Sequence, residues 1–518
     1  MESYAKSSEL TPVEWFAEAR AGFEDLVVGL SGSEALSMDL SALESFVMER
    51  GREVLRRVLQ GHFDLREAAE RKVEVRGHDG IRRVFARRRG RRVTSVVGDV
   101  VSGRMIYEAT CFDCRAPLDS TLNLPPETYS LGVRRIAAEA ASRSSYDEVV
   151  CEVASTIGRC VPKRQVEEIV LRAANDVVAF YASQPQVDES ADQLIVITTD
   201  GKGIVMRDEH LRPETRQAAA KAKERRRGQP MKRLAPGEKR GRKRMAQIAV
   251  VYSIAPFVRT ADDVLADLRP VRDAARARRP RPVNKRVSAS VTDDPKAVID
   301  RAFADAAQRD PERRRTWIAV VDGSPTQLAL VRDAARALGV NVRIIIDFIH
   351  VLEYLWNAAH CFHSEQKEAE KWVQTRARML LEGTSASDVA GGIRRSATLR
   401  GLVERKAVDK CADYLRKLAL HLDYATALRI GAPIASGVVE GMCRYLVNDR
   451  MDKTGSRWSL HGAEAVLHLR VLRTNDDFAD YWRFHAAAEH KRNHTDRYEG
   501  PAPQPLVARE RPALRRVK

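Results

Sequence analysis

The stretch that decides the fold is residues 194–201 (LIVITTDG), a run of β-branched residues that ends in Asp-Gly. The same pattern recurs at residues 316–323 (TWIAVVDG), and a third apolar run at residues 342–347 (VRIIID) also ends in Asp. Two more apolar runs, at residues 245–254 and 287–291, lie between these stretches. Two segments with helical spacing, at residues 295–308 and 326–338, lie there too. Strands that alternate with helices predict an α/β protein with a largely buried sheet.

Two acidic residues share one position in this pattern. Asp200 and Asp322 each end an apolar run and each precede a glycine, which lets a ligand approach the backbone closely. A single aspartate of this kind is commonly a turn or cap residue. Two aspartates of this kind in one sheet favour a shared site. Carboxylates that are held close together repel each other, so such a site needs a cation. Hard oxygen ligands select Mg²⁺ or Mn²⁺.

The overall charge favours a polyanionic partner. The 518 residues include 88 Lys and Arg against 71 Asp and Glu, a formal net charge of +17, and 44% are hydrophobic, which is a globular composition. No run of about 18 apolar residues occurs, which excludes a transmembrane helix. The first residues are polar and the seven cysteines are few and odd in number, so we expect a cytoplasmic protein without a disulfide framework.

Much of the positive charge lies in two runs. Residues 213–246 carry 13 Lys or Arg against 3 Glu, and residues 82–92 carry seven Arg and no acid. Such runs are either solvated surface or contacts to DNA phosphates, and their scarcity of acids favours phosphates. The candidate contacts are Arg87, Arg88, Arg89, Arg225, Arg226, Arg227, Arg240 and Lys243.

The first third of the chain has three segments with different patterns. Residues 1–70 have helical spacing, residues 71–128 alternate and are rich in glycine, and residues 129–182 are helical again. These patterns predict helical and small β regions that precede the α/β part and bind DNA. Cys111 and Cys114 form half of a zinc knuckle, but no second Cys-x-x-Cys follows, which argues against zinc.

Residues 146–169 fit a helix-turn-helix, with a glycine at position 158 for the turn. In that arrangement Lys163, Arg164 and Gln165 face outward at the start of the second helix, where base edges are read. An ordinary pair of packed helices would show the same pattern, so both readings stay open.

Short motifs then identify a family resemblance. They are TDGKG at 199–203, PGEKR at 236–240, VDGSP at 321–325, DFIHVLEY at 347–354, GIRRS at 392–396, GVVEG at 437–441 and GSRW at 455–458. In these motifs and their order, over about residues 190–490, the chain resembles bacterial insertion-sequence transposases of the DDE class. It is most similar to the ISKra group of the Mutator-like lineage.

The resemblance implies the architecture of the larger part of the chain. We expect an RNase H-like catalytic core at residues 190–352, an all-α insertion at 353–432, and C-terminal core helices with the catalytic Glu at 433–495. The tail, residues 496–518, is basic and rich in proline, and we expect it to be disordered.

The resemblance also assigns roles to residues. Asp200, Asp322 and Glu440 form the catalytic triad and bind two Mg²⁺ or Mn²⁺ ions, with Asp200 bridging both. Asp347 and His350 form an Asp-x-x-His signature, in which His350 either supports the site structurally or acts near the scissile phosphate. Arg457 and Trp458 belong to the last motif. Trp458 is either a core residue or stacks on a flipped base.

The implied activity is DNA transposition: binding to the terminal inverted repeats, metal-dependent strand cleavage, and strand transfer into target DNA. The implied partners are double-stranded DNA and further copies of the chain, as a dimer or higher oligomer. Two alternatives stay open, a domesticated DNA-binding protein without catalysis and an RNase H-like nuclease that does not join strands. The presence of all three acids argues against the first.

Overall fold

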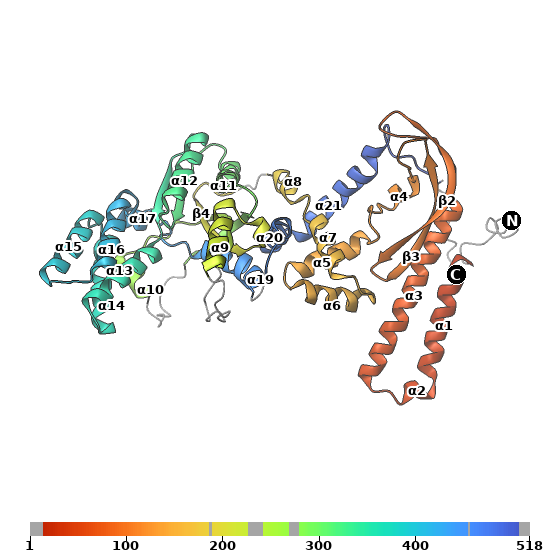
Figure 1. Ribbon diagram of the computed structural model, residues 1–518, viewed down its shortest axis with the longest axis horizontal. Coiled ribbons are helices and arrows are strands. Elements are labelled where there is room, and N and C mark those ends of the chain that lie inside the picture. Colours follow the sequence, from red (N-terminus) through yellow and green to blue (C-terminus); the bar gives the residue numbers. More distant parts are fainter. Residues whose placement is uncertain (1–13, 186–188, 226–241, 269–278, 454–455, 507–518) are drawn as a thin grey trace. The chain divides into compact units, whose positions relative to one another are not determined.

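The computed structural model describes residues 14–185, 189–225, 242–268, 279–453 and 456–506 (Figure 1). The chain divides into two compact units, one formed by Met1–Ser183 together with Asp476–Lys518, and the other by Gln184–Asn475. We call them the first and the second unit. No described helix is both long and apolar enough to cross a membrane.

The first unit begins with a helical hairpin. Helix α1 (Ala17–Ser31) and the long α3 (Leu40–Ala69) pack against each other, joined by the short α2 (Ser33–Leu36) (Figure 1). The side chain of Asp39 caps α3 by accepting a 2.8 Å hydrogen bond from the backbone N–H of Ala42. The expected helical segment is therefore a two-helix hairpin.

A three-stranded antiparallel sheet follows, as the alternating pattern predicts. Its strands β1 (Val75–Arg76), β2 (Arg82–Ser95) and β3 (Gly98–Glu108) lie in the order β1-β2-β3. Helix α3 packs on this sheet, and Phe63 of α3 shares a small core with Val93, Val100 and Leu124.

The next helices are α5 (Leu131–Ala141), α6 (Tyr146–Ile157), α7 (Lys163–Ala173) and α8 (Val177–Ala182). The helix, turn and helix expected at residues 146–169 are present, and Gly158 ends α6 with a φ of 70°, a left-handed conformation that favours glycine. The turn is held by packing, since Val153, Ile157, Val161 and Val166 are all buried.

Helix α21 (Phe478–Asn493) belongs to the first unit, which differs from the expectation that residues 433–495 lie together in the catalytic core. A buried polar network explains its place. His485 forms a 2.7 Å contact with Asp176, and Arg134 lies 2.7 Å from Glu489. Separating these buried groups would leave charges without partners, so α21 stays with the helices that supply them.

The second unit contains a five-stranded mixed sheet, so the expected α/β class is confirmed. Its strands lie in the order β6-β5-β4-β7-β8, where β4, β5 and β6 pair antiparallel and β4, β7 and β8 pair parallel. The strands are β4 (Leu194–Val205), β5 (Lys243–Ile254), β6 (Val283–Ser290), β7 (Trp317–Val321) and β8 (Val342–Ile346). Helices pack on the sheet, among them α11 (Pro295–Arg309), α12 (Pro325–Leu338), α18 (Gly437–Cys443) and α20 (Leu460–Thr474).

The segment between β8 and α18 is helical. It comprises α13 (Phe348–Phe362), α14 (Gln366–Leu381), α15 (Ala386–Leu399), α16 (Lys406–Lys417) and α17 (Tyr424–Arg429). Tyr354 of α13 stacks on Tyr414 of α16 with ring centroids 3.9 Å apart, which ties these two helices together.

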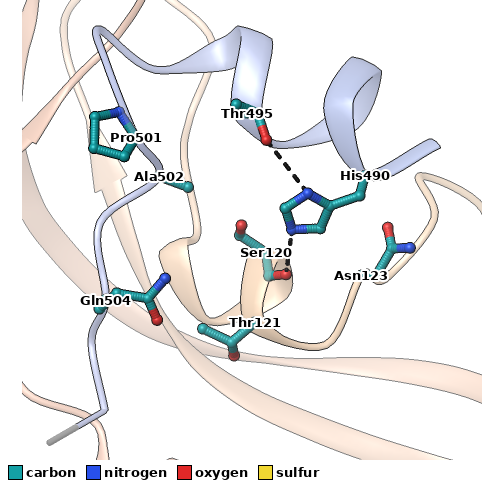
Figure 2. A pocket seen from close by; sticks show the side chains of 8 residues that line it. All are labelled: Ser120, Thr121, Asn123, His490, Thr495, Pro501, Ala502 and Gln504. Atoms are coloured by element: carbon teal, nitrogen blue, oxygen red, sulfur yellow. Dashed lines mark hydrogen bonds between the residues drawn. The ribbon is translucent and has the colours of Figure 1, made fainter. Parts of the chain in front are cut away.

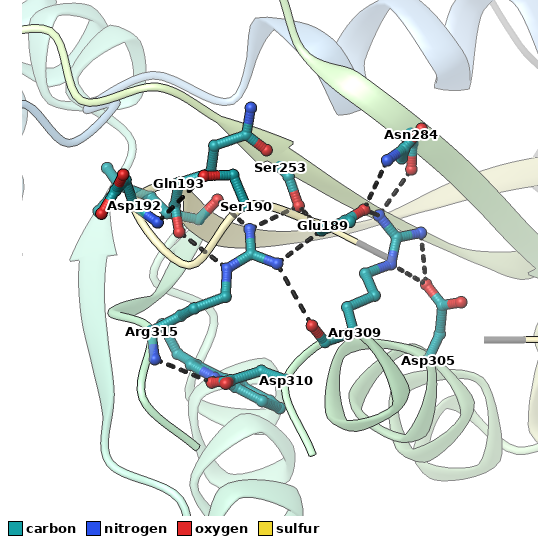
Figure 3. Close-up of polar contacts among 12 residues, drawn as sticks. Glu189, Ser190, Asp192, Gln193, Ser253, Asn284, Asp305, Arg309, Asp310 and Arg315 are labelled. Atoms are coloured by element: carbon teal, nitrogen blue, oxygen red, sulfur yellow. Dashed lines mark hydrogen bonds and ion pairs between the residues drawn. The ribbon is translucent and has the colours of Figure 1, made fainter. Parts of the chain in front are cut away.

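One end of the sheet is fixed by a buried ion network (Figure 3). Glu189, whose side chain is fully buried, lies 2.6 Å from Arg315 and 3.4 Å from Arg309, and it accepts a 2.9 Å hydrogen bond from Asn284. The network joins the residues that precede β4 and β7 to α11 and β6. It lies at the amino ends of the parallel strands.

Candidate active site

Three aspartates lie just beyond the last parallel pairs of β4, β7 and β8. The parallel pairs Thr198↔Val320 and Val321↔Ile346 fix the register of β4, β7 and β8. Continued along the chain, this register brings Asp200, Asp322 and Asp347 to the same level at one edge of the sheet. That edge is where ligands bind in open α/β sheets.

Asp200 is not at a strand end, which corrects the expectation for this residue. Strand β4 continues to Val205, because its antiparallel partner β5 extends beyond the end of β7 and pairs Asp200 with Ile248. The Asp200 side chain accepts a 2.6 Å hydrogen bond from the N–H of Gly201 and a 3.2 Å hydrogen bond from the thiol of Cys443.

Asp322 directly follows β7 and starts the turn into α12. Its carboxylate accepts a 2.9 Å hydrogen bond from the N–H of Ser324, and its carbonyl accepts a 2.9 Å hydrogen bond from the hydroxyl of Tyr414. Gly323 has a φ of 87°, and a Cβ there would lie 2.6 Å from the side chain of Leu418. The glycine is therefore required by the turn, while the half-buried Asp322 still faces the cleft described below.

Asp347 connects the sheet to the helix that carries Glu440. It is fully buried and caps α13 by accepting a 2.7 Å hydrogen bond from the N–H of Ile349. Its other oxygen accepts hydrogen bonds from the N–H of Ser436, at 2.9 Å, and from the Ser436 hydroxyl. Ser436 immediately precedes α18, so this carboxylate fixes where the Glu440 helix begins.

Glu440, His350 and Asp347 form a compact group. One potential ligand atom of each residue lies within 4.8 Å of those of the other two. Burial raises the pKa of Glu440, and the negative charges of Asp347 and Asp200 raise it further. For His350 burial lowers the pKa, but a 3.2 Å contact with Glu353 and the nearby aspartates outweigh burial and raise it above its ordinary value.

The structure thus brings the expected residues together only in part. Among the described residues, Asp200, Asp322 and Glu440 do not form a group whose ligand atoms all lie within 4.8 Å. Glu440 approaches Asp200 closely enough to feel its charge, and Cys443, one turn further along α18, contacts Asp200 directly. Asp322 lies close enough to His350 for its charge to raise the pKa of that histidine.

A cleft of about 630 Å³ opens beside Asp322. Its lining includes His350, Glu353 and Tyr354 from α13, and Lys406 and Lys410 from α16. The Lys410 ammonium lies over the Tyr354 ring, 5.4 Å from its centroid. The cleft joins the acidic edge of the sheet to a surface of mixed charge on the helical segment, where Glu353 and Glu404 lie among the lysines.

Sequence reasoning missed the residues that hold the acids in place. Cys443 is buried, and its position three residues after Glu440 directs its thiol to Asp200. Ser436 and Tyr414 carry no signal of their own in the sequence, because their role depends on contacts between segments far apart in the chain.

The DNA-contact candidates of the second unit differ in their surroundings. Trp458 is only 6% exposed, and its indole N–H donates a 3.0 Å hydrogen bond to the carbonyl of Met451, so it is a core residue and is not free to stack on a base. Lys243 lies 3.6 Å from Asp452, whereas Arg457 is exposed. Arg226, Arg227 and Arg240 lie outside the described residues, as does the side chain of Arg225, the last residue of α9 (Pro213–Arg225).

The arginine run of β2 is not free of acids in space. Arg87 lies 2.8 Å from Glu108 on the neighbouring strand, and Arg88 donates a 3.0 Å hydrogen bond to the carbonyl of Glu67 and lies near its carboxylate. Arg89 is exposed and forms no ion pair with the described residues. Strand pairing therefore brings acids beside most of these arginines, and their positive charge is largely neutralised within the fold.

The turn region of the helix-turn-helix is also paired. Lys163 lies 2.9 Å from Asp147, the 88% exposed side chain of Arg164 lies 3.4 Å from Glu168, and Gln165 is half-buried. Lys163 and Arg164 are both exposed at the start of α7, so exposure does not separate them as candidates for contact with a base edge.

Two other places in the first unit hold polar groups, but neither fits a cation. A pocket of about 490 Å³ contains His490, which bonds to Ser120 and Thr495, but no acid lines it (Figure 2). Asp176, His485 and Glu489 form a compact group, but guanidinium groups already neutralise it, so it fits a cation poorly. Cys111 and Cys114 are exposed and join no such group among the described residues.

Comparison with protein-family models found no match for this chain, and comparison with curated proteins found none either.

Proposed function

We propose that this protein is a DNA transposase of the DDE class, which binds the ends of an insertion sequence and catalyses metal-dependent strand cleavage and strand transfer. One observation carries the proposal. Asp200 and Asp322 lie at adjacent positions of one sheet edge, and α18 is held so that Glu440, from a distant part of the chain, approaches Asp200.

The topology of the second unit supports an RNase H-like core. The chain forms a three-stranded antiparallel meander and then adds two parallel strands on the other side of its first strand. Neighbouring strands β4 and β7 therefore belong to the two halves of the sheet, and a ligand is expected to bind where these halves meet. The helices between β8 and α18 support the proposed all-α insertion.

The residues present fit divalent cations. Asp200 and Asp322 are half-buried and Glu440 is exposed, so each has carboxylate oxygens that can reach an ion. The repulsion that raises the pKa of Glu440 is relieved when a cation binds between the acids. We propose Asp200, Asp322 and Glu440 as ligands of two Mg²⁺ or Mn²⁺ ions. Such ions supply stabilisation of the attacking and leaving oxygens during phosphoryl transfer.

The surrounding residues position the site and the DNA. Asp347 has both oxygens engaged, so we assign it to holding α18. We assign Lys406 and Lys410, which line the cleft together with the acids Asp322, Glu353 and Glu404, to contacts with a DNA phosphate. The exposed candidates for contacts outside the cleft include Arg89, Lys163, Arg164 and Arg457.

A strand-transfer assay tests the proposal. Labelled duplexes from the DNA that flanks the gene are incubated with the full chain and Mg²⁺, and cleaved and joined strands are separated. The wild-type chain is expected to produce both, and Asp200→Asn and Glu440→Gln neither, while all three bind the duplex equally in a gel-shift assay. Glu404→Gln, which changes another acid that lines the cleft, is the matched control and is expected to stay active.

Other outcomes would assign the protein to the alternatives. Cleavage without joining would indicate a nuclease, and binding without cleavage would indicate a DNA-binding protein that lacks catalysis. Full cleavage by Asp200→Asn would refute the assigned triad.

A further inference from the structure

The helical hairpin of the first unit exposes an unusual amount of apolar surface. Nine large apolar residues between positions 23 and 58 are exposed: Phe23, Val27, Val28, Leu36, Leu40, Val47, Met48, Leu55 and Val58. Within α1 only Ala19 and Leu26 are buried. Monomeric proteins rarely expose large contiguous apolar patches, and such patches mark interaction surfaces.

Four of these nine residues lie along two helix faces. Phe23 and Val27 of α1, with Phe16 just before this helix, follow a spacing of seven and four residues, and Val47, Val54 and Val58 of α3 follow the same spacing, so each set lies along one face. The two faces border a common groove of about 530 Å³, lined by Phe16, Phe23, Val54 and Val58.

The opposite side of α3 already has partners. Phe63 packs into the core of the small sheet, and Gln60 exchanges hydrogen bonds of 2.9 Å and 2.8 Å with the backbone of Val101. The groove side has no partner among the described residues of the first unit. Its apolar residues therefore need another surface to cover them.

We infer that this groove is a dimer interface, covered by the same hairpin of a second copy of the chain. The charges on its rim are self-complementary. Arg20 and Glu24 both line the groove, one turn apart on α1, and neither forms an ion pair within the described residues. A two-fold axis that crosses α1 between them brings Arg20 of each copy against Glu24 of the other, as an isologous interface requires.

The size of the surface also fits a second hairpin. At 1.5 Å per residue α1 is roughly 22 Å and α3 roughly 45 Å long, and two packed helices are about 20 Å wide. The area of this strip is comparable to the roughly 800 Å² of surface that each partner buries in a stable interface. Two hairpins joined in this way form a four-helix bundle, in which apolar seams with spacings of three and four residues meet at the centre.

DNA does not fit this groove. Its floor is apolar, and α1 carries Glu18, Glu24 and Asp25 against a single Arg20, so phosphates would be repelled. The inference does not depend on the proposed activity, since the interface would form without DNA or metal ions.

Sedimentation velocity of the full chain over a range of concentrations, without DNA, tests the inference. The wild-type chain is expected to be a dimer that dissociates on dilution. Arg20→Glu and Glu24→Arg should each raise the dissociation constant about tenfold. Each substitution puts like charges opposite each other at both of the symmetry-related contacts. The double variant R20E/E24R restores opposite charges and should return the constant to near the wild-type value.

A second set of variants tests the apolar floor. Phe23→Glu is expected to give a monomer whose helical circular dichroism is unchanged, whereas Val403→Glu, at a 95% exposed apolar position in the second unit, should leave the dimer intact. If Phe23→Glu does not fold, the three charge variants still decide the matter.

Three results would overturn the inference. They are a monomer at every concentration, single charge reversals without effect on a dimer, or a double reversal as weak as the single ones. A monomer that instead binds phosphatidylcholine vesicles through Phe23 would assign the groove to a lipid surface.

Discussion

The carboxylate of Asp347 accepts a 2.9 Å hydrogen bond from the backbone N–H of Ser436, which lies 89 residues further along the chain. Between these two residues the chain forms helices α13 to α17, so the contact closes the base of the whole helical segment. A second hydrogen bond of 2.8 Å, from the N–H of Phe348 to the carbonyl of Ile434, lies beside it. Together they place Glu440 relative to the end of β8.

Replacement of Asp347 should therefore loosen α18. Asp347→Ala leaves the buried N–H of Ser436 unsatisfied, which costs about 1–3 kcal/mol. We expect faster hydrogen exchange in peptides that contain Glu440, with little change in β4. Asp388→Ala, at an exposed position in the first turn of α15, is the control. Unchanged exchange around Glu440 would show that Asp347 does not position this helix.

The hydrogen bond from Cys443 to Asp200 gives a second prediction. Cys443→Ser keeps a donor at this position, whereas Cys443→Val removes it and keeps an apolar side chain of similar size. If the bond orients Asp200, we expect the valine variant to cleave DNA about tenfold more slowly and the serine variant to stay near wild type. Single-turnover cleavage with unfolding curves measures this. Equal rates in both variants would contradict the orienting role.

The stability of the second unit should depend on acid pH through Glu464. Burial alone raises the pKa of this carboxyl, but hydrogen bonds from His468, Ser290 and the N–H of Val291 outweigh it and lower the pKa to about 2. Because its ordinary value is 4.5, the folded state binds fewer protons than the unfolded chain between these values. This stabilisation is complete above pH 4.5 and is lost as the pH falls towards 2.

The expected loss is about 3 kcal/mol of unfolding free energy. Urea unfolding at several acid pH values should show it in the wild type and show a smaller slope in Glu464→Gln. The same slope in both proteins would mean that Glu464 does not carry the effect.

The network around Glu189 should be critical for folding (Figure 3). Glu189→Ala removes the carboxylate that lies 2.6 Å from the nearly buried Arg315, while Arg309 keeps its ion pair with Asp305, and we expect a loss of roughly 3–5 kcal/mol. Replacement of Glu312, whose ion pair with Arg314 is exposed, should cost less than about 1 kcal/mol. Thermal unfolding compares the two variants, and similar melting temperatures would show that burial of the network adds no stability.

The sheet could be predicted because its signals are local. Runs of β-branched residues mark β4, β7 and β8, and parallel pairing then brings the acids that follow them to one edge. The extension of β4 beyond Asp200 could not be predicted in this way, because it depends on pairing with β5, a segment more than 40 residues further along the chain.

Contacts between distant segments explain the other differences. The acids that pair with the arginines of β2 come from neighbouring strands and helices, so a run without acids in the sequence is largely neutralised in the fold. Trp458 is buried because its segment pairs with Met206 at the end of β4. The place of α21 in the first unit follows from the buried pair His485–Asp176.

Binding of Mn²⁺ to the full chain, measured by electron paramagnetic resonance, tests most directly whether the acidic edge holds divalent ions. We predict that the wild-type chain binds two ions, that Asp200→Asn, Asp322→Asn and Glu440→Gln each weaken or abolish binding while the fold is kept, and that Glu404→Gln binds as the wild type does. Binding that is unchanged in all three variants would contradict a metal centre formed by Asp200, Asp322 and Glu440.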